Sequence, residues 1–238
     1  MVIPKKEEYI FYQGEKFQVE FYFTEAGRMP AKECLEEAAL DVKVKLAVLV
    51  KYIAEQGKIF DITKFRVIDS KEKIYEFKPL QYRFFNFFYE GRKIIITNGY
   101  MKKPQKVSKK DLERARDIKK DYTYRAKGGA VIMEKNKTYL DKLMVEKDFR
   151  GKFDQEYQNL CIAEQIVQAR HHAHLTQSAL AKRIHTTKSA ISRYESADYD
   201  KYGIALLTRI AKACGTDLKI NFVTSKSVKN GSRFATAV

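Results

Sequence analysis

The stretch LTQSALAKRIHTTKSAISRYE, from Leu175 to Glu195, decides how the second half of the chain folds. A threonine stands directly before each of two short amphipathic segments, at Thr176 and Thr187. In that position a threonine hydroxyl accepts a hydrogen bond from the first turn of a helix. His185 and Thr186 lie between the two segments and are expected to form the turn. The stretch therefore predicts two short helices joined by a tight turn.

The apolar residues of this stretch share one face of each predicted helix. We expect Leu180 and Ile184 to face the core, and Ile191 to pack back against the first helix. The small side chain of Ala181 lets the two helices cross closely. The residues left facing outward are Lys188, Ser189, Ser192 and Arg193. This is the geometry of a helix that lies in the major groove of DNA with its first residues at base edges.

Residues 160–216, which include the downstream segment LLTRIAKACG, resemble the Xre/Cro-like helix-turn-helix family. The resemblance implies operator DNA as a partner and a homodimer formed through this domain. Lysine and arginine suit the O6 and N7 acceptors of guanine. A pair of helices that only packs, as in some degenerate regulators, is the alternative. The residues expected to contact DNA are Gln177, Thr187, Lys188, Ser189, Ser192 and Arg193.

The charge of the chain favours a polyanionic partner. Its 238 residues carry 46 Lys and Arg against 30 Asp and Glu, a formal net charge of +16. Residues 1–127 hold 28 basic and 19 acidic side chains (+9), and the remainder holds 18 and 11 (+7). Because each half is basic by itself, each is expected to meet nucleic acid separately. Solubility alone is the other explanation of this charge.

No pattern in the sequence predicts a metal site, a disulfide or a membrane segment. Three cysteines lie far apart without a CxxC pair, which is typical of a reducing compartment. The histidines of HHAH (171–174) lack a carboxylate or cysteine to complete a metal site, and they suit a helix C-terminus. The run VKLAVLVKYIA is too short for a membrane span. We therefore expect a cytoplasmic protein without a cofactor.

The first half alternates between strand and helix patterns. The aromatic and β-branched run FQVEFYFTE (Phe17–Glu25) predicts a strand, and Pro30 suits the first turn of a following helix. Further elements are a helix over Asp41–Gln56 that ends at Gly57, the strands KIYEFKP, YRFFNFFY and RKIIITNGY, and a helix over Ser108–Tyr122. The expected fold class is an α+β domain with an antiparallel sheet, followed by an all-α helix-turn-helix domain with one late strand at Asp217–Val223.

Basic and aromatic residues gather at the end of this sheet. Gly91 to Lys110 contains seven basic residues and no acidic one, and Tyr100 lies among them. Cations that hold phosphates and rings that stack on bases suit single-stranded RNA. A solvated basic rim is the other interpretation.

Residues 15–125 resemble the RelE/HigB toxin superfamily. The blocks that carry the resemblance are QVEFYFTEAGRMPAKECLEE, KIYEFKPLQYRFFNFF and RKIIITNGYMKKPQKVSKKDLERARDIKKDY. The resemblance implies an RelE-like fold that cleaves mRNA in the ribosomal A site. It assigns catalysis to Arg83 on a strand and to the basic turn formed by Lys102, Lys103 and Lys106.

The acid and base of such a reaction are harder to assign. Several relatives use a histidine, but all four histidines of this chain lie at 171 or beyond. Attack by a ribose 2′-hydroxyl needs a base, stabilisation of charge on the phosphorane, and an acid for the leaving oxygen. A lysine, a tyrosine or a carboxylate must then serve, and Tyr82, Tyr100 and Tyr122 are candidates.

The segment AKGGAVIMEK (126–135) resembles the start of a second protein inside the chain. Lys127–Gly129 can be encoded by a ribosome-binding sequence, and the segment that begins at Met133 resembles the N-terminus of antitoxins in HigBA-like modules. An ordinary flexible linker is the alternative. The expected divisions are a toxin-like domain at 1–126, a linker and helical antitoxin segment at 127–158, a DNA-binding domain at 159–224 and a disordered tail at 225–238.

The sequence thus predicts a single-chain type II toxin–antitoxin fusion. A ribosome-dependent mRNA endoribonuclease would be neutralised by a DNA-binding antitoxin and autorepressor, whose segment Tyr139–Tyr157 reaches the toxin-like domain in the same chain. The alternative is a transcription regulator whose first domain is a catalytically dead nuclease used for dimerisation or RNA sensing. Arg83 and the lysine turn favour the fusion, while the missing histidine keeps the alternative open.

Overall fold

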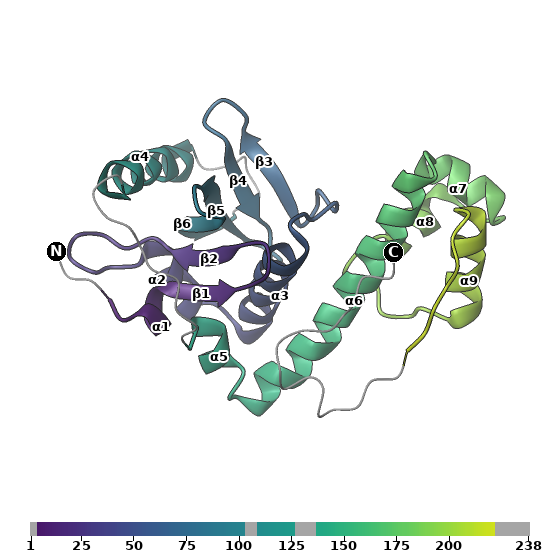
Figure 1. Ribbon diagram of the computed structural model, residues 1–238, viewed down its shortest axis with the longest axis horizontal. Helices are drawn as coiled ribbons and strands as arrows, with labels where there is room; N and C mark the ends of the chain where they lie inside the picture. The colour runs from purple at the N-terminus through teal and green to yellow at the C-terminus, as the bar shows by residue number, and fades with distance from the viewer. Residues whose placement is uncertain (1–3, 103–108, 127–136, 222–238) are drawn as a thin grey trace.

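The computed structural model describes residues 4–102, 109–126 and 137–221 and contains a sheet domain and a helical domain joined by one long helix (Figure 1). The sheet has six strands in the order β1-β2-β6-β5-β4-β3. The strands are β1 (Ile10–Gln13), β2 (Gln18–Phe21), β3 (Phe65–Asp69), β4 (Ile74–Phe77), β5 (Tyr82–Tyr89) and β6 (Lys93–Met101).

The sheet is mixed, whereas the sequence predicts an antiparallel one. β2 pairs parallel with β6, and every other neighbouring pair is antiparallel. The helices after β2 carry the chain to the far edge of the sheet, where β3 begins. Three reversals then bring β6 back beside β2 in the same direction. The parallel pairing of β2 with β6 depends on the long connection between these strands, so no local sequence pattern predicts it.

Two strands of the sheet domain, β1 and β3, were not predicted from the sequence. β1 and β3 are short and carry polar residues, so their strand character depends on the neighbours with which they pair. β2 is also shorter than the predicted Phe17–Glu25. The prediction of a late strand at Asp217–Val223 is wrong for its described part, because residues 217–221 have no regular secondary structure. A strand needs a partner for its backbone groups, and the elements around this segment are helices.

The helices follow the predicted starts and stops closely. Pro30 lies at the first turn of α2, and Gly57 ends α3 with a φ of 85°. α4 continues four residues beyond the predicted end at Tyr122, while its predicted cap at Ser108 lies outside the described residues. The helices are α1 (Lys6–Tyr9), α2 (Pro30–Glu36), α3 (Leu40–Gln56), α4 (Lys109–Ala126), α5 (Tyr139–Leu143), α6 (Lys147–His172), α7 (Gln177–Arg183), α8 (Lys188–Tyr194) and α9 (Ile204–Ala213).

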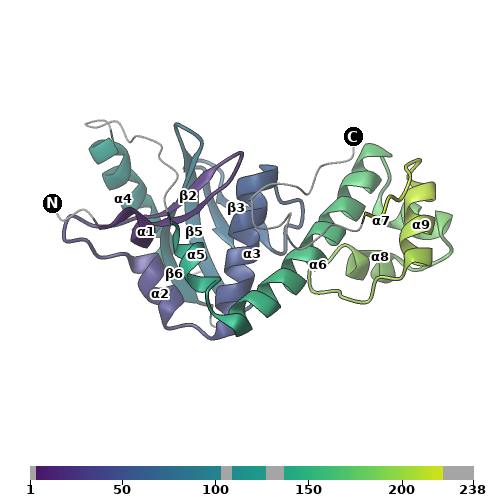
Figure 2. The same cartoon turned by 60° about the horizontal axis from the view of Figure 1, so that its bottom comes forward.

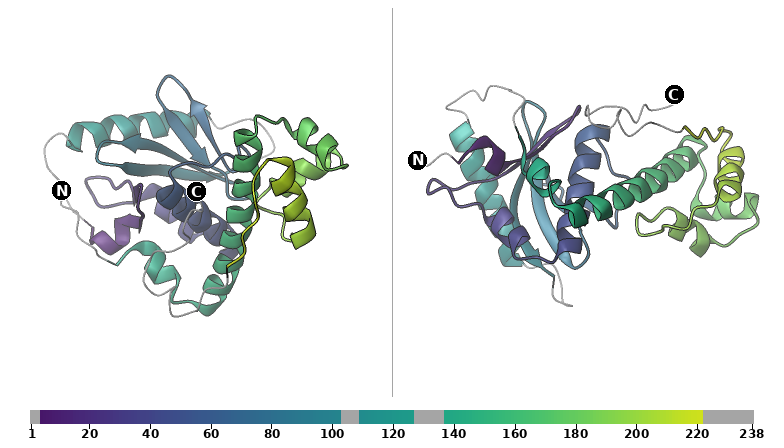
Figure 3. Two further views of the ribbon diagram at one scale, coloured as in Figure 1. Left: turned by 45° about the vertical axis from the view of Figure 1, so that its right-hand side comes forward. Right: turned by 90° about the horizontal axis from the view of Figure 1, so that it is seen from below.

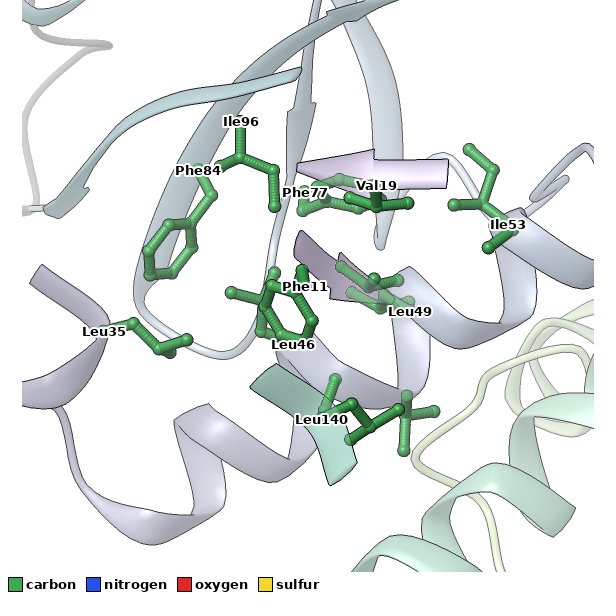
Figure 4. Packing of buried hydrophobic residues seen from close by; sticks show 14 of the residues in the cluster. Phe11, Val19, Leu35, Leu46, Leu49, Ile53, Phe77, Phe84, Ile96 and Leu140 are labelled. Atoms are coloured by element: carbon green, nitrogen blue, oxygen red, sulfur yellow. The ribbon is translucent and has the colours of Figure 1, made fainter. Parts of the chain in front are cut away.

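Helices cover both faces of the sheet. α2 and α3 lie on one face and α4 lies on the other, as the turned views in Figure 3 show. On the α3 face, Phe77 and Phe84 from the strands meet Leu46 and Leu49 from the helix (Figure 4). On the α4 face, Phe85 packs with residues of α4 in a smaller cluster.

The core on the α3 face also includes α5 and the first half of α6. The Tyr139 ring lies 5.5 Å from the Phe11 ring and 5.4 Å from the Phe21 ring, measured between centroids. Along α6, the rings of Phe149, Phe153 and Tyr157 stack in sequence at 5.9 Å each. They share one face, as their spacing of four predicts. The segment Tyr139–Tyr157 therefore completes the core of the sheet domain.

α6 continues without interruption into the helical domain. Its 26 residues span roughly 39 Å at 1.5 Å per residue. Its second half contributes Ile166 to the core of the helical domain, together with Leu180, Ile191 and Ile210. The expected boundary between 158 and 159 thus falls inside one helix, which Figure 2 shows running between the two domains. Among the helices of the described ranges, none combines the length and hydropathy needed to cross a bilayer.

Ion pairs join the two domains beside this apolar contact. Lys45 of α3 lies 2.8 Å from a carboxylate oxygen of Glu156 on α6 and 2.9 Å from one of Asp198. Lys64, just before β3, lies 2.5 Å from the other oxygen of Asp198. Asp198 belongs to the segment between α8 and α9. The helical domain is therefore fixed to the sheet domain through α6 and through this segment.

Glu164 of α6 is a buried carboxylate between the domains. Its side chain accepts hydrogen bonds from the backbone N–H of Phe60 (2.9 Å) and of Asp61 (3.0 Å). Burial raises the pKa of Glu164 to about 7, although these two hydrogen bonds favour the ionised form. Repulsion from Asp61 and Glu195 adds to the effect of burial.

Replacing Phe149 by alanine should destabilise the sheet domain although Phe149 belongs to α6. Its side chain is fully buried in the α3-face core, so we expect a loss of about 3–5 kcal/mol in the free energy of unfolding. Urea denaturation measures the loss, and amide exchange in β1 and β2 locates it. Val145→Ala, at a side chain 77% exposed, is the control and should change stability by less than about 0.5 kcal/mol. A loss confined to the helical domain would contradict the shared core.

Glu164 should make stability depend on pH between about 4.5 and about 7. Its pKa is raised in the folded state, so its contribution is most favourable below the unfolded pKa and is lost as pH rises to about 7. The free energy of unfolding of Glu164→Gln should therefore rise relative to that of the wild type as pH increases through this range. The difference should reach about 3 kcal/mol at pH 8, where Glu164 is ionised in both states. Urea denaturation at several pH values measures the difference. Glu146→Gln, at the exposed start of α6, should show no such trend.

Candidate nucleic-acid interfaces

Three basic side chains surround a buried carboxylate at one end of the sheet. Glu76 of β4 is fully buried, and its Oε1 lies 2.6 Å from Nε of Arg66, its partner on β3. Nε of Arg83 on β5 lies 3.9 Å from Glu76 Oε2. The register that pairs Phe77 with Phe84, extended by one residue on each strand, sets Lys78 opposite Arg83. Arg66 and Arg83 thus reach Glu76 from the strands on either side, and Lys78 lies beside them just after β4.

Lys78 has an unusual environment within this cluster. Its ammonium group donates a hydrogen bond to the backbone carbonyl of Ile62 at 3.1 Å. Desolvation and the positive charges of Arg66 and Arg83 lower the pKa of Lys78, and Glu76 offsets part of that effect. A lysine with a lowered pKa releases and takes up a proton more readily near neutral pH than an ordinary one.

Arg83, which the resemblance assigns to catalysis, is held by backbone carbonyls. Its Nη1 donates to the carbonyl oxygens of Leu80 (2.9 Å) and Tyr82 (2.6 Å). Only 12% of its side chain is exposed. Across the sheet, Arg83 pairs with Tyr100 of β6. The guanidinium is therefore fixed in orientation at the edge of the cationic cluster.

The three candidate tyrosines lie in three different environments. Tyr82 packs against the α3-face core, on the opposite side of the sheet from Arg83, because neighbouring residues of a strand alternate. Tyr100 lies on the side of Arg83, with its ring 5.5 Å from the Phe85 ring. Tyr122 packs against Phe87, and burial raises its pKa far above the ordinary value. Of the three, Tyr100 is the cross-strand partner of Arg83 on the same face of the sheet.

The predicted lysine turn is described only in part. Lys102 is exposed just after β6, and its backbone N–H donates to the carbonyl of Gln81 at 2.8 Å. Lys103 and Lys106 lie outside the described residues. No sequence pattern predicted a functional role for Arg66, Glu76 or Lys78. The alternation of Glu76 and Lys78 on one strand was a signal for them, but their meeting with Arg66 depends on β3, which was not predicted.

The helix-turn-helix forms as predicted, with both threonine caps in place. The Thr176 hydroxyl accepts from the Ala179 N–H, and the Thr187 hydroxyl accepts from the Ala190 N–H, each at 3.1 Å. His185 takes a left-handed conformation, with a φ of 54°, at the turn between α7 and α8. The predicted reading positions on α8, which are all exposed, are Lys188, Ser189, Ser192 and Arg193.

A buried ion pair fixes α8 to the rest of the helical domain. Arg170 of α6 donates to both carboxylate oxygens of Glu195, at 2.5 and 2.9 Å. Gln177, a predicted DNA contact, donates its side-chain amide to Glu195 at 2.8 Å. Arg193 extends along the rings of Tyr194 and Tyr199, at 5.7 Å from each centroid. These contacts fix the C-terminal end of α8, the helix that carries the predicted reading positions.

Comparisons with known proteins match both parts of the chain. Residues 33–120 match the family described as phage derived protein Gp49-like. Residues 166–220 match the helix-turn-helix family. No curated protein matches the chain. The two matches confirm the predicted arrangement, in which a domain similar to the RelE/HigB-like toxins precedes an Xre-type DNA-binding domain.

Removing the Arg193 side chain should weaken and broaden DNA recognition. We expect Arg193→Ala to cost about 1–3 kcal/mol on the best duplex and to relax the preference at one base position, since arginine pairs with guanine through two hydrogen bonds. Selection from random duplexes, followed by binding titrations at fixed salt, measures both effects. Lys212→Ala on α9 removes the same charge away from α8 and is the control. Equal binding of every duplex by the wild type would contradict sequence-specific recognition.

Proposed function

We propose that the chain is a toxin–antitoxin fusion whose sheet domain cleaves translated mRNA. The proposal is supported by the two family matches, which join a domain similar to the RelE/HigB-like toxins to an Xre-type helix-turn-helix domain. The helical domain would neutralise the toxin in the same chain and repress transcription from its operator. The observation that carries the nuclease assignment is the cluster of Arg66, Lys78 and Arg83 around the buried Glu76.

The cluster offers the groups that RNA cleavage requires. In attack by a ribose 2′-oxygen on the neighbouring phosphorus, a base removes the 2′-hydroxyl proton and an acid supplies a proton to the departing 5′-oxygen. Lys78, with its lowered pKa, is suited to exchange one of these protons. Arg66 and Arg83 are suited to stabilise charge on the phosphorane. Tyr100, the cross-strand partner of Arg83, is the candidate group for transferring the other proton.

The position of the helical domain supports neutralisation within one chain. Ala197 and Asp198 line a small cavity together with Lys64, Lys78 and Pro79 of the sheet domain. The helical domain thus lies against the side of the cationic cluster. We propose that a toxin carrying this domain is hindered from accepting mRNA on the ribosome.

We propose that the helical domain binds operator DNA as a homodimer. α8 has only seven residues, so a single copy contacts few base pairs. Two copies related by a two-fold axis would read half-sites about one helical turn apart, roughly 34 Å.

A regulator with an inactive sheet domain is the second candidate function. The observation that favours it is the engagement of Arg83 by two carbonyl oxygens and Glu76, in a domain whose sequence lacks histidine. In that case the cluster would bind RNA or a second copy of the chain without cleavage.

Residues 1–162, which keep the core residues of α5 and α6 but lack the helix-turn-helix, should arrest growth and cut mRNA in a purified translation system. The full chain should be harmless in the same bacterial host. Lys78→Ala in the shortened chain should lower the cleavage rate by about 100-fold or more. Lys71→Ala, an exposed lysine in the β3–β4 turn, is the control. If residues 1–162 fold, as circular dichroism shows, yet leave translated mRNA intact, the regulator with an inactive domain is favoured.

A further inference from the structure

We propose that Lys45 and Lys64 form a phosphate subsite of the sheet domain, and that Asp198 occupies this subsite in place of an RNA phosphodiester. The inference rests on the proposed function in taking RNA as the ligand of the sheet domain. It goes beyond that function in identifying two further RNA-binding lysines and the group that blocks them.

The two lysines converge on one carboxylate from different elements. Nζ of Lys45 lies 2.9 Å from Oδ1 of Asp198, and Nζ of Lys64 lies 2.5 Å from Oδ2. The lysine side chains are only 18% and 12% exposed, whereas that of Asp198 is 52% exposed. The cations belong to the sheet domain, since Lys45 lies in α3 and Lys64 just before β3, whereas the anion comes from the segment between α8 and α9. One oxygen on each ammonium is also how a phosphodiester would bind, through its two free oxygens.

The subsite adjoins the cationic cluster around Glu76 at the end of the sheet. Lys78 borders both, although Lys45 lies on α3 and Arg83 on the opposite face. Lys45, Lys64 and Lys78 line the same small cavity. The backbone N–H of Lys78 donates to the carbonyl of Lys64 at 2.8 Å, so the two residues are neighbours just beyond the paired ends of β3 and β4. Lys78 in turn lies opposite Arg83. A single strand of RNA whose reacting phosphate lies at Arg83 would therefore continue towards Lys64.

The charges of the subsite fit a monoanion. Lys45 and Lys64 are balanced by Glu156 and Asp198 while the domains are docked. If Asp198 leaves, one positive charge lacks a partner, and a phosphodiester carries one negative charge. The hydrogen bonds from Lys64 and Lys45 lower the pKa of Asp198 even though its burial alone would raise it, so Asp198 stays ionised in this place.

Docking of the domains does not need Asp198. The stacked rings of Phe149, Phe153 and Tyr157, which belong to the core of the sheet domain, already hold α6 against that domain. Ion pairs with a partly exposed member contribute little to stability. The main effect of Asp198 is then to occupy Lys45 and Lys64, so that other anions cannot bind them.

The test measures how a labelled single-stranded RNA of about ten nucleotides binds to the full chain, by fluorescence anisotropy at several salt concentrations. Asp198→Asn should bind the RNA about tenfold more tightly than the wild type does. The slope of log K against log salt should steepen by about 0.7, the value for one added phosphate contact on a single strand. Asp200→Asn, which makes the same change of charge two residues away, is the matched control and should leave both values nearly unchanged.

A second substitution locates the effect. Adding Lys64→Gln to Asp198→Asn should remove the gain, whereas adding Lys58→Gln, at an exposed lysine of the same domain, should preserve it. The proposal is overturned if Asp200→Asn gives an equal gain, if the gain survives Lys64→Gln, or if Asp198→Asn leaves RNA binding unchanged in a folded chain. A gain for duplex DNA in place of RNA would also overturn it.

The outcome is distinct from that of the proposed nuclease activity. Binding is measured without ribosomes and without cleavage. Tighter RNA binding by Asp198→Asn, together with inactive residues 1–162, would support the subsite and reject the nuclease. Active residues 1–162 with no gain for Asp198→Asn would support the nuclease and reject the subsite.

Discussion

The packing of α5 and α6 against the α3 face of the sheet is the contact on which the rest of the structure depends. Tyr139, Phe149 and Phe153 bury aromatic rings in the same core that β1, β2 and α3 use. A large apolar area removed from water stabilises this contact far more than the ion pairs around it do. The sheet domain and the helical domain are therefore joined by a shared core and one continuous helix, although the two family matches cover them separately.

The cationic cluster owes its form to a buried negative charge. Glu76 would be costly in the sheet without partners, and Arg66 and Arg83 supply them from the strands on either side. The same contacts hold the two guanidinium groups in fixed positions, as a site for a phosphate group requires. The arrangement stabilises the buried carboxylate and concentrates positive charge beside the docked helical domain.

The local features of this chain could be predicted, and the features that depend on distant partners could not. Thr176 and Thr187 act within one helical turn, so their sequence is sufficient to place α7 and α8. The strand β3 and the parallel pairing of β2 exist only because segments far apart in the chain meet. Arg83 came from a resemblance, whereas Arg66 could be assigned only once the register of β3 with β4 was known.

The continuity of α6 also fixes the rotational phase between the two domains. A helix turns about 100° and advances 1.5 Å with each residue. One residue inserted between the buried Leu160 and Ile166 would therefore rotate the exposed face of α8 by about a quarter of a revolution relative to the sheet domain. The length of this helix can change during evolution only in steps close to whole turns if both ends are to keep their contacts. If the chain began as two independent proteins, their shared helix now couples the two domains, so a change of length in one also changes the orientation of the other.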